Sequence, residues 1–319
     1  MASRTLDSAP SILPLYARAA TSMVPGASLL PFIPGGGGEI PDLDLKLEGV
    51  AVDPAAVAAY AKVCGFTLRD HLPPTYPHVL AFPQHMAVLA DGGFPFGAVG
   101  LIHLENRIEQ QRRVGFGEEL AIRVRPTKLQ PHPKGRTFSL LTEVKVGREK
   151  VWESVSTMLR RGKGDGENAV VPGVPEQLRA EATGGDCAPL PAEAPASAEW
   201  RLGGDLGRRY ASVSGDRNPI HMHSLTAKPL GFPAAIAHGM WTKARCLATL
   251  ESRLPDAFAV DVRFRKPILL PARVEFASAA EGEQIAFAVR DAKRQTPHLD
   301  GRVAPLESKP KAKSGRKAR

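Results

Sequence analysis

The sequence predicts an α+β protein made of two similar units, each with helices followed by antiparallel strands. The first observation is an internal repeat, because the pattern Tyr-Ala-x-Val-x-Gly occurs at residues 60–65 and again at residues 210–215, an offset of 150 residues. The second is that strand-like runs follow each copy. The third is a stretch rich in glycine and proline between them, which is typical of a linker. Two repeated units of this kind are expected to join their sheets edge to edge.

The first unit is expected to begin at residue 43, after an arm of residues 1–42 that is rich in proline and glycine. The alternation of Leu43, Leu45 and Leu47 predicts a strand. A helix is expected over residues 54–64, with Asp53 as its N-cap. A second short helix is expected at residues 83–90. The strands that follow are expected at residues 100–108, 119–125, 137–146 and 150–159.

The second unit is expected to follow the linker and to carry the chemistry. A buried helix is predicted to begin near Gly239, because apolar side chains recur at helical spacing as far as Leu254. Its strands are expected at residues 257–264, 272–277, 284–290 and 299–303. The predicted organisation is thus an arm (1–42), a first unit (43–161), a linker (162–198), a second unit (199–305) and a basic tail (306–319).

A polar loop in the second unit combines groups suited to acid–base chemistry. Asp216 and His221 lie five residues apart on a loop stiffened by proline, so they can hold one water between them as base and acid. Asn218 can orient that water or the imidazole. Gly239 opens the buried helix, where backbone N–H groups and the helix dipole can stabilise negative charge on an oxygen of a bound substrate. The predicted catalytic residues are therefore Asp216, Asn218, His221 and Gly239.

This loop and helix resemble those of the MaoC-like, (R)-specific enoyl-CoA hydratases, and the pair of units resembles their double-hotdog type. The resemblance rests on a tyrosine followed by Ser-Gly-Asp-x-Asn-Pro-Ile-His and then Ala-His-Gly, at residues 210, 214–221 and 237–239. It implies reversible hydration of a trans-2-enoyl thioester to the (3R)-3-hydroxyacyl thioester in fatty-acid metabolism. Tyr210, Ser214 and His238 would shape the substrate site, with Tyr210 packing the loop and His238 supporting the helix start.

The two copies differ where chemistry is expected. The first has Phe66 and Leu68 at the positions of Asp216 and Asn218, so the acid and the amide are lost, and His71 stands without a carboxylate partner. Aligning the helices by their apolar pattern places Pro83 at the position of Gly239 and removes an N–H donor. The first unit is therefore expected to be non-catalytic and to contribute part of the acyl-chain pocket.

Neither a metal nor a redox cofactor is expected, since no Cys/His cluster has metal-ligand spacing. The thioester carrier is coenzyme A or acyl carrier protein. Arg263, Arg265 and Lys266 are candidates for phosphate contact, although their alternation with apolar residues also fits a half-buried strand. Two alternatives stay open: a non-catalytic acyl-thioester-binding or scaffold subunit of a larger synthase, and a hotdog thioesterase.

The net charge of +9 is concentrated at the C-terminus, where six basic residues fall in the last eleven and leave +3 on the rest. This distribution argues against specific nucleic-acid binding and predicts a solvated, disordered tail. Three widely spaced cysteines favour a reducing cytoplasm. Neither a signal peptide nor a membrane-spanning stretch is expected. A homodimer remains compatible with the sequence.

Overall fold

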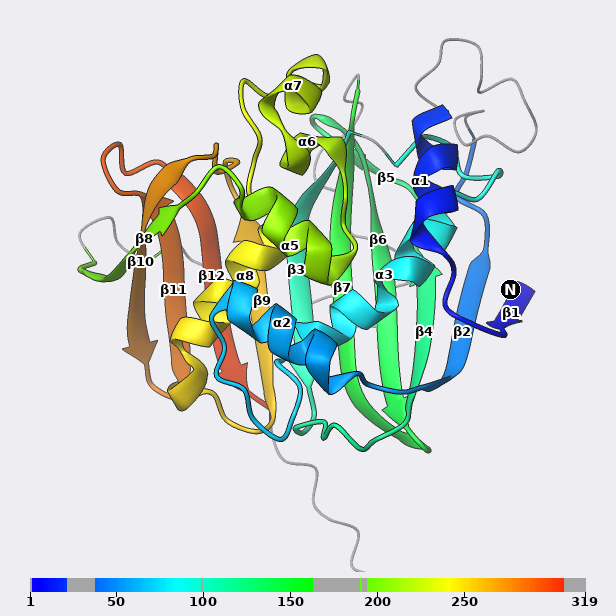
Figure 1. Ribbon diagram of the computed structural model, residues 1–319, viewed down its shortest axis with the longest axis horizontal. Helices are drawn as coiled ribbons and strands as arrows, with labels where there is room; N and C mark the ends of the chain where they lie inside the picture. Colours follow the sequence, from blue (N-terminus) through cyan, green and yellow to red (C-terminus); the bar gives the residue numbers. More distant parts are fainter. Residues whose placement is uncertain (1, 22–37, 99, 163–189, 191–193, 307–319) are drawn as a thin grey trace, which may run out of the picture.

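A single twelve-stranded sheet forms the back of the molecule, and the long helices lie across one face of it (Figure 1). The computed structural model describes residues 2–21, 38–98, 100–162, 190 and 194–306. The strand order is β1-β2-β4-β6-β7-β3-β9-β12-β11-β10-β8, with β5 paired to β6. The first half of the path comes from the early part of the chain and the second half from the late part. The architecture is therefore the α+β double hotdog that the sequence predicts.

The first half of the chain supplies three helices, α1, α2 and α3, and seven strands among its described residues. Its elements are β1 (Ala2–Leu6), α1 (Ile12–Thr21), β2 (Leu43–Val50), α2 (Pro54–Cys64), α3 (Tyr76–Leu89), β3 (Leu101–Gln110), β4 (Leu120–Pro126), β5 (Gln130–His132), β6 (Gly135–Val146) and β7 (Glu149–Arg161). The predicted strands and the helix at residues 54–64 are confirmed. The side chain of Asp53 accepts a hydrogen bond from the N–H of Ala55, as expected of an N-cap.

The second half repeats this order with an added polar segment before its central helix. Its elements are β8 (Ala196–Leu202), α5 (Leu206–Ser214), α6 (Pro219–Met222), α7 (Ser224–Ala227), η2 (Lys228–Leu230), α8 (Gly239–Thr249), η3 (Glu251–Arg253), β9 (Phe258–Phe264), β10 (Ala272–Glu281), β11 (Gln284–Asp291) and β12 (Pro297–Pro305). Gly65 and Gly215 end α2 and α5 in the same left-handed conformation, with φ of 86° and 78°. The repeat in the sequence is therefore a repeat in structure.

The prediction of the second helix is wrong, and so is the alignment with Gly239 that was based on it. The helix expected at residues 83–90 begins seven residues earlier, at Tyr76, so Pro83 lies inside α3 and does not correspond to Gly239. Apolar periodicity misplaced the start because α3 is apolar around much of its circumference, and the residues before Pro83 are buried as well. The arm of residues 1–42 also contains ordered structure, namely β1, which pairs in parallel with β2, and helix α1.

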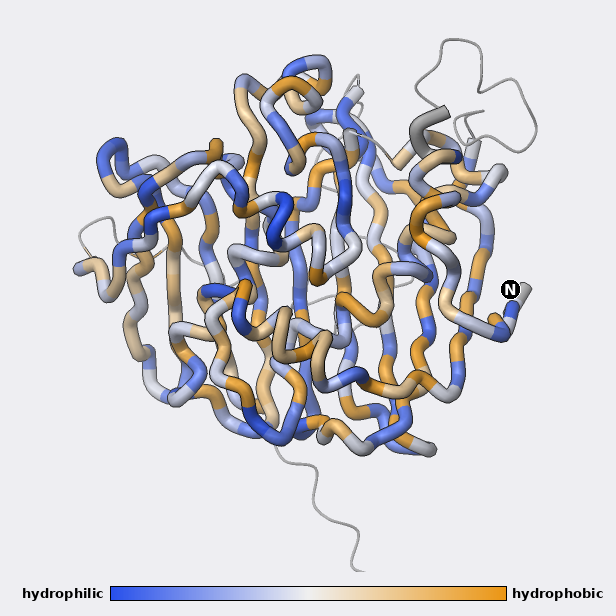
Figure 2. Tube along the Cα trace, in the orientation of Figure 1, coloured by the Kyte–Doolittle hydropathy of each residue, from blue (hydrophilic) through white to orange (hydrophobic). Residues whose placement is uncertain are grey.

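The hydrophobic core lies between the helices and the sheet. Strands alternate along their length between hydrophobic and hydrophilic residues, as expected of a sheet with one covered face (Figure 2). Buried side chains from both halves form one continuous cluster, from Val57 on α2 to Leu247 on α8 and Phe276 on β10. In the part of the chain described here, no helix is long and apolar enough to cross a membrane.

The two half-sheets join through antiparallel pairing of β3 with β9. Opposite charges face each other directly across this junction, with Glu105 opposite Arg263 and Arg107 opposite Asp261. Lys243 of α8 is fully buried behind the same junction. Its ammonium group donates to the backbone carbonyl and side-chain oxygen of Asn106 at 3.0 and 2.6 Å, and to the carbonyl of Val260 at 3.1 Å. One buried cation therefore ties the central helix to both strands of the junction.

Replacing Lys243 with Met is expected to lower the free energy of unfolding by about 2 kcal/mol or more, because buried acceptors left without a donor cost about 1–3 kcal/mol each. Urea denaturation monitored by circular dichroism measures the change. Lys62→Met on the exposed side of α2 is the matched control and should leave the midpoint nearly unchanged. Equal stability of both variants would show that Lys243 does not hold the junction.

Candidate active site

The polar loop of the second half connects helices α5 and α6, which bring its side chains together. Helix α5 ends at Gly215, Asp216 follows on the loop, and Asn218 caps α6 by accepting from the N–H of Ile220 at 3.4 Å. Helix α6 carries His221. Helix α5 can approach α6 because it has a glycine at position 207, where a Cβ atom would lie 1.9 Å from the carbonyl oxygen of His221. The sequence reasoning did not identify this glycine.

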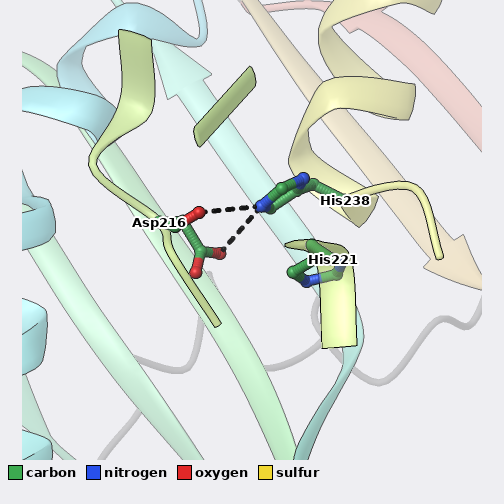
Figure 3. A group of neighbouring side chains, drawn as sticks. All are labelled: Asp216, His221 and His238. Carbon is green, nitrogen blue, oxygen red and sulfur yellow. Dashed lines mark hydrogen bonds and ion pairs between the residues drawn. The ribbon is translucent and has the colours of Figure 1, made fainter. Parts of the chain in front are cut away.

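The three side chains Asp216, His221 and His238 form the centre of the site (Figure 3). One polar atom of each lies within 4.8 Å of the others. The rings of His221 and His238 stack, with centroids 3.6 Å apart and an angle of 24° between their planes. Nε2 of His238 donates to the backbone carbonyl of Asp216 at 3.0 Å and lies 3.8 Å from the carboxylate atom Oδ2. His238 therefore supports the loop from the start of α8, as predicted for a residue at that position.

The protonation of His221 is fixed by its surroundings. Nδ1 lies 2.8 Å from the carbonyl oxygen of Ile236, which can only accept, so Nδ1 carries the proton. In the neutral ring Nε2 then keeps its lone pair. Burial lowers the pKa of His221, against the opposing effects of Asp216 and the Ile236 carbonyl, so the neutral form prevails at pH 7. Neutral His221 can therefore accept a hydrogen bond from a water through Nε2.

Asp216 stays ionised although much of it is enclosed. Burial acts to raise its pKa, but His238, His221, the N–H of Asn218 and the hydroxyl of Tyr16 outweigh this effect and hold the pKa below its ordinary value. The remaining exposure of the side chain, 28%, faces the cavity that it lines. A water hydrogen-bonded at about 2.8 Å to two atoms can bridge a separation of about 5 Å. The polar atoms of Asp216 and His221, which lie within 4.8 Å of each other, are therefore spaced to hold a water between them.

The same three residues are a possible donor set for a metal ion, but their geometry fits one poorly. Zinc ligands converge on one point at about 2.0–2.2 Å, with ring lone pairs directed at it. Here the two imidazole rings lie face to face, and one nitrogen of each is already committed to a backbone carbonyl. The arrangement favours acid–base chemistry over metal binding.

Helix α8 begins at Gly239, directly beside this cluster. The first N–H groups of an α-helix have no partner within the helix and carry partial positive charge. A Cβ at position 239 would lie 2.9 Å from Cε1 of Phe264, so glycine lets α8 start close against β9. The helix start therefore lies on the cavity wall, where its N–H groups are available as donors.

The cavity has a volume of about 250 Å³ and is built by both halves of the chain. The second half contributes the polar cluster and the helix start. The first half contributes apolar side chains from α3 and from the strands beneath it, which are Phe82, Met86, Leu89, Leu140 and Met158. Basic residues Arg161, Arg265 and Lys266 lie elsewhere on its lining. The cavity thus joins an apolar chamber, a reactive centre and a basic region.

Several other sequence-predicted residues can now be placed. Tyr210 is buried and packs against His238, with ring centroids 4.8 Å apart, so it supports the cluster from behind. The hydroxyl of Ser214 accepts from the N–H of Asp216 at 3.2 Å. Arg263 is not part of the cavity lining, because the register of β9 turns it toward Glu105 at 2.9 Å. Its suggested phosphate contact is therefore not supported, whereas Arg265 and Lys266 do reach the cavity.

The cavity also contains residues that the sequence did not indicate. Tyr16 of α1 donates from its hydroxyl to Oδ1 of Asp216 at 3.0 Å. His78 and His85 of α3 and His103 of β3 lie on the lining too. A local pattern could not find Tyr16, since it lies 200 residues before its partner and outside both predicted units. The three histidines are polar residues among apolar ones, and this contrast could have marked them as candidates. Their spacing in the sequence, however, did not relate them to Asp216.

Fold and site together define a class of protein: a double hotdog whose second unit brings a carboxylate and two imidazoles together beside the start of a helix. A model of the MaoC like domain matches residues 195–301. The chain is 38% identical over 282 residues to 3-hydroxyacyl-thioester dehydratase X of Mycobacterium tuberculosis, an alignment that covers 88% of this chain and 95% of that protein. The chain therefore belongs to the MaoC-like dehydratase family.

Solved structures agree with this assignment. A crystal structure of HtdX from Mycobacterium tuberculosis matches with a TM-score of 0.70 and 36% identity, covering 82% of this chain and all of that one. A MaoC-like dehydratase from Phytophthora capsici matches with a TM-score of 0.65 over 84% of this chain and 96% of its own, at 19% identity, which supports the fold alone.

The buried histidines are expected to make stability depend on pH. Burial lowers the pKa of His78 to about 4 and the pKa values of His103 and His238 to about 3. Between these values and the unfolded value near 6.5, the unfolded chain binds more protons than the folded one, so the free energy of unfolding falls as pH decreases. We expect a loss of about 1 kcal/mol per histidine at pH 5.5 relative to pH 7.5, measured by urea denaturation.

The variant His78→Gln removes one of these groups. Its free energy of unfolding should fall less steeply as pH decreases, because one histidine fewer takes up a proton on unfolding. The matched control is His223→Gln, on the exposed turn before α7, which leaves the buried set intact. A free energy of unfolding that stays constant from pH 7.5 to 5.5 in the unmodified protein would contradict the expectation.

Proposed function

We propose that the protein is an (R)-specific hydro-lyase that interconverts trans-2-enoyl thioesters and (3R)-3-hydroxyacyl thioesters. The observation that carries the proposal is the placement of an ionised carboxylate and a neutral imidazole beside the free start of a buried helix, in a cavity with an apolar chamber. The membership in the MaoC-like dehydratase family supports the reaction class.

In the direction of hydration, one water lies between Asp216 and Nε2 of His221. Its oxygen bonds to C3 while Asp216 takes one of its protons, and the C2–C3 double-bond electrons move toward C2 and the thioester carbonyl. The N–H at Gly239 stabilises the negative charge on the thioester oxygen. Asp216 then returns the proton to C2, so the product has gained one water. Dehydration follows the same path in reverse.

The roles of the two halves differ in this proposal. The second unit, residues 199–305, performs the chemistry. The first unit, residues 43–161, provides the apolar chamber, because α3 and the strands beneath it form that wall of the cavity. The first half has no carboxylate at the position of Asp216, since Phe66 follows Gly65 there and is buried.

Two alternatives are less well supported. A thioesterase would use the carboxylate to attack, or to activate water toward, the thioester carbonyl. Membership in the MaoC-like dehydratase family, with 38% identity to a 3-hydroxyacyl-thioester dehydratase, favours addition at C3 over hydrolysis. A non-catalytic acyl-thioester binder has no need of an ionised carboxylate and a neutral histidine arranged around one water.

The carrier part of the substrate is proposed to pass the basic region of the cavity. Coenzyme A and the phosphopantetheine arm of acyl carrier protein both carry phosphate, which basic side chains bind. Arg265 is partly neutralised by its ion pair with Asp300, which leaves Lys266 and Arg161, two exposed basic residues on the lining, as the candidates. A 39% identity over 70 residues to 3-hydroxybutyryl-CoA dehydratase of Methylorubrum extorquens, covering 45% of that protein, is compatible with a coenzyme A substrate.

Replacing Asp216 with Asn is expected to lower kcat for hydration about 10²- to 10⁴-fold, because the amide cannot take the proton from water. The measurement follows loss of the conjugated enoyl-thioester absorbance with trans-2-enoyl-CoA substrates of short, medium and long chain. The matched control is Asp205→Asn, an exposed acid at the start of α5, which should turn over normally.

A thiol-trapping reagent in a parallel assay separates hydration from hydrolysis, since only hydrolysis releases the thiol. Full activity of the Asp216→Asn variant would remove Asp216 from the mechanism. Thiol release at the rate of absorbance loss would replace the hydratase with a thioesterase.

Replacing Lys266 with Gln is expected to raise KM for an enoyl-CoA about 2- to 5-fold with little change in kcat, as an exposed charge contributes about 0.2–1 kcal/mol to binding. The difference should shrink at high salt, because screening weakens the interaction. Lys293→Gln, an exposed lysine on the turn after β11, is the control. An unchanged KM at low salt would argue that Lys266 does not contact the carrier.

A further inference from the structure

The hydroxyl of Tyr16 contacts the proposed base directly, although the proposed mechanism gives it no role. It accepts a hydrogen bond from the N–H of Arg217 at 2.7 Å and donates to Oδ1 of Asp216 at 3.0 Å. Tyr16 lies outside residues 195–301, the part matched by the MaoC like domain. It is also part of the cavity lining. The N-terminal helix α1 thus reaches the reactive centre of the second unit.

The position of Tyr16 follows from the way α1 docks. Tyr16 and Ile12 are four residues apart, so they lie on the same face of the helix. A Cβ at Gly215 would lie 2.7 Å from Cδ1 of Ile12, which means that Ile12 packs directly on the turn that ends α5. One helical turn later, Tyr16 meets the next residue of that turn, Asp216. Helix α1 also contacts α3, the helix that walls the cavity.

The two oxygens of Asp216 have different surroundings as a result. Oδ1 accepts from the hydroxyl of Tyr16 and from the N–H of Asn218 at 3.1 Å. Oδ2 lies 3.8 Å from Nε2 of His238, beyond the length of an ordinary hydrogen bond. Two donors on Oδ1 fix the rotation of the carboxylate and turn Oδ2 toward the histidines.

We propose that Tyr16 is a positioning residue of the active site, which acts through Asp216 by occupying Oδ1 and leaving Oδ2 to take the proton from water. This inference rests on the proposed function, in which Asp216 is the base. The hydroxyl itself is not the proton donor or acceptor of the reaction. Burial, and next the neighbouring Asp216, raise the pKa of Tyr16 well above its ordinary value, so it stays protonated and keeps donating.

The test is a double-mutant cycle with Tyr16→Phe, Asp216→Asn and the combined variant. Phenylalanine keeps the ring against Asp216 and removes only the hydroxyl. A hydrogen bond to a charged group is strong enough that its loss should lower kcat about 10-fold or more, with KM changed less than 3-fold. If Tyr16 acts through Asp216, removing the hydroxyl should have no further effect in the Asp216→Asn background.

The control is Tyr76→Phe, which removes a hydroxyl from the first turn of α3 at a position that does not line the cavity. It should leave kcat and KM unchanged. Thermal denaturation of each variant checks that the fold is kept, and a Tyr16→Leu variant tests the same hydroxyl if the phenylalanine variant loses stability.

The outcomes separate this inference from the proposed function. A kcat of Tyr16→Phe equal to that of the unmodified protein overturns the positioning role, and a higher kcat shows instead that Tyr16 blocks the water position. A 10-fold loss that persists in the Asp216→Asn background also overturns it, since Tyr16 then acts independently of Asp216. Full turnover by Asp216→Asn alone rejects the proposed base and the inference with it, whereas a slow Asp216→Asn beside a normal Tyr16→Phe rejects the inference only.

Discussion

The antiparallel pairing of β3 with β9 is the constraint on which the rest of the structure depends. It turns two half-sheets into one and sets the central helices α3 and α8 over the same face. Helix α3 contributes apolar side chains and α8 begins beside the polar cluster, so the cavity that both line has an apolar side and a polar side. The charged pairs across the junction and the buried ammonium of Lys243 fix its register. A slip along this junction would move the acyl chamber relative to the reactive loop.

The duplication of a unit has allowed the two copies to specialise. Both copies keep the turn in which a left-handed glycine ends a helix, at Gly65 and Gly215. Only the second follows that glycine with a carboxylate, and there the buried charge is supported by donors on several sides. The first copy follows it with Phe66, whose side chain is buried. A buried ionised group has to be stabilised by hydrogen bonds and dipoles around it. A second buried carboxylate, at the position of Phe66, would need the same support and would have no evident role in the cavity.

Much of this could be predicted from the sequence because the information was local. Caps, left-handed glycines and alternating strands depend on neighbouring residues, so α2, the strands and the start of α8 were predicted correctly. The reactive loop was recognisable because Asp216, Asn218 and His221 are close in sequence. Other features depend on partners that are distant in the sequence. The contact of Tyr16 with Asp216 is one such feature, and the orientation of Arg263, which is set by the register of β9, is another. The start of α3 was misplaced because a helix buried around most of its surface has no clear apolar face.

The docking of α1 also bears on when the site is assembled. Proteins are synthesised from the N-terminus, and domains generally fold as units as they emerge. Tyr16 is made 200 residues before Asp216, so the first half of the sheet can form while the docking surface of α1, the turn at Gly215, does not yet exist. Helix α1 therefore has to remain available until the second half has folded. The contact between Tyr16 and Asp216 therefore requires that synthesis has continued into the second unit, since a nascent chain ending at residue 198 or before has no Asp216 for Tyr16 to contact.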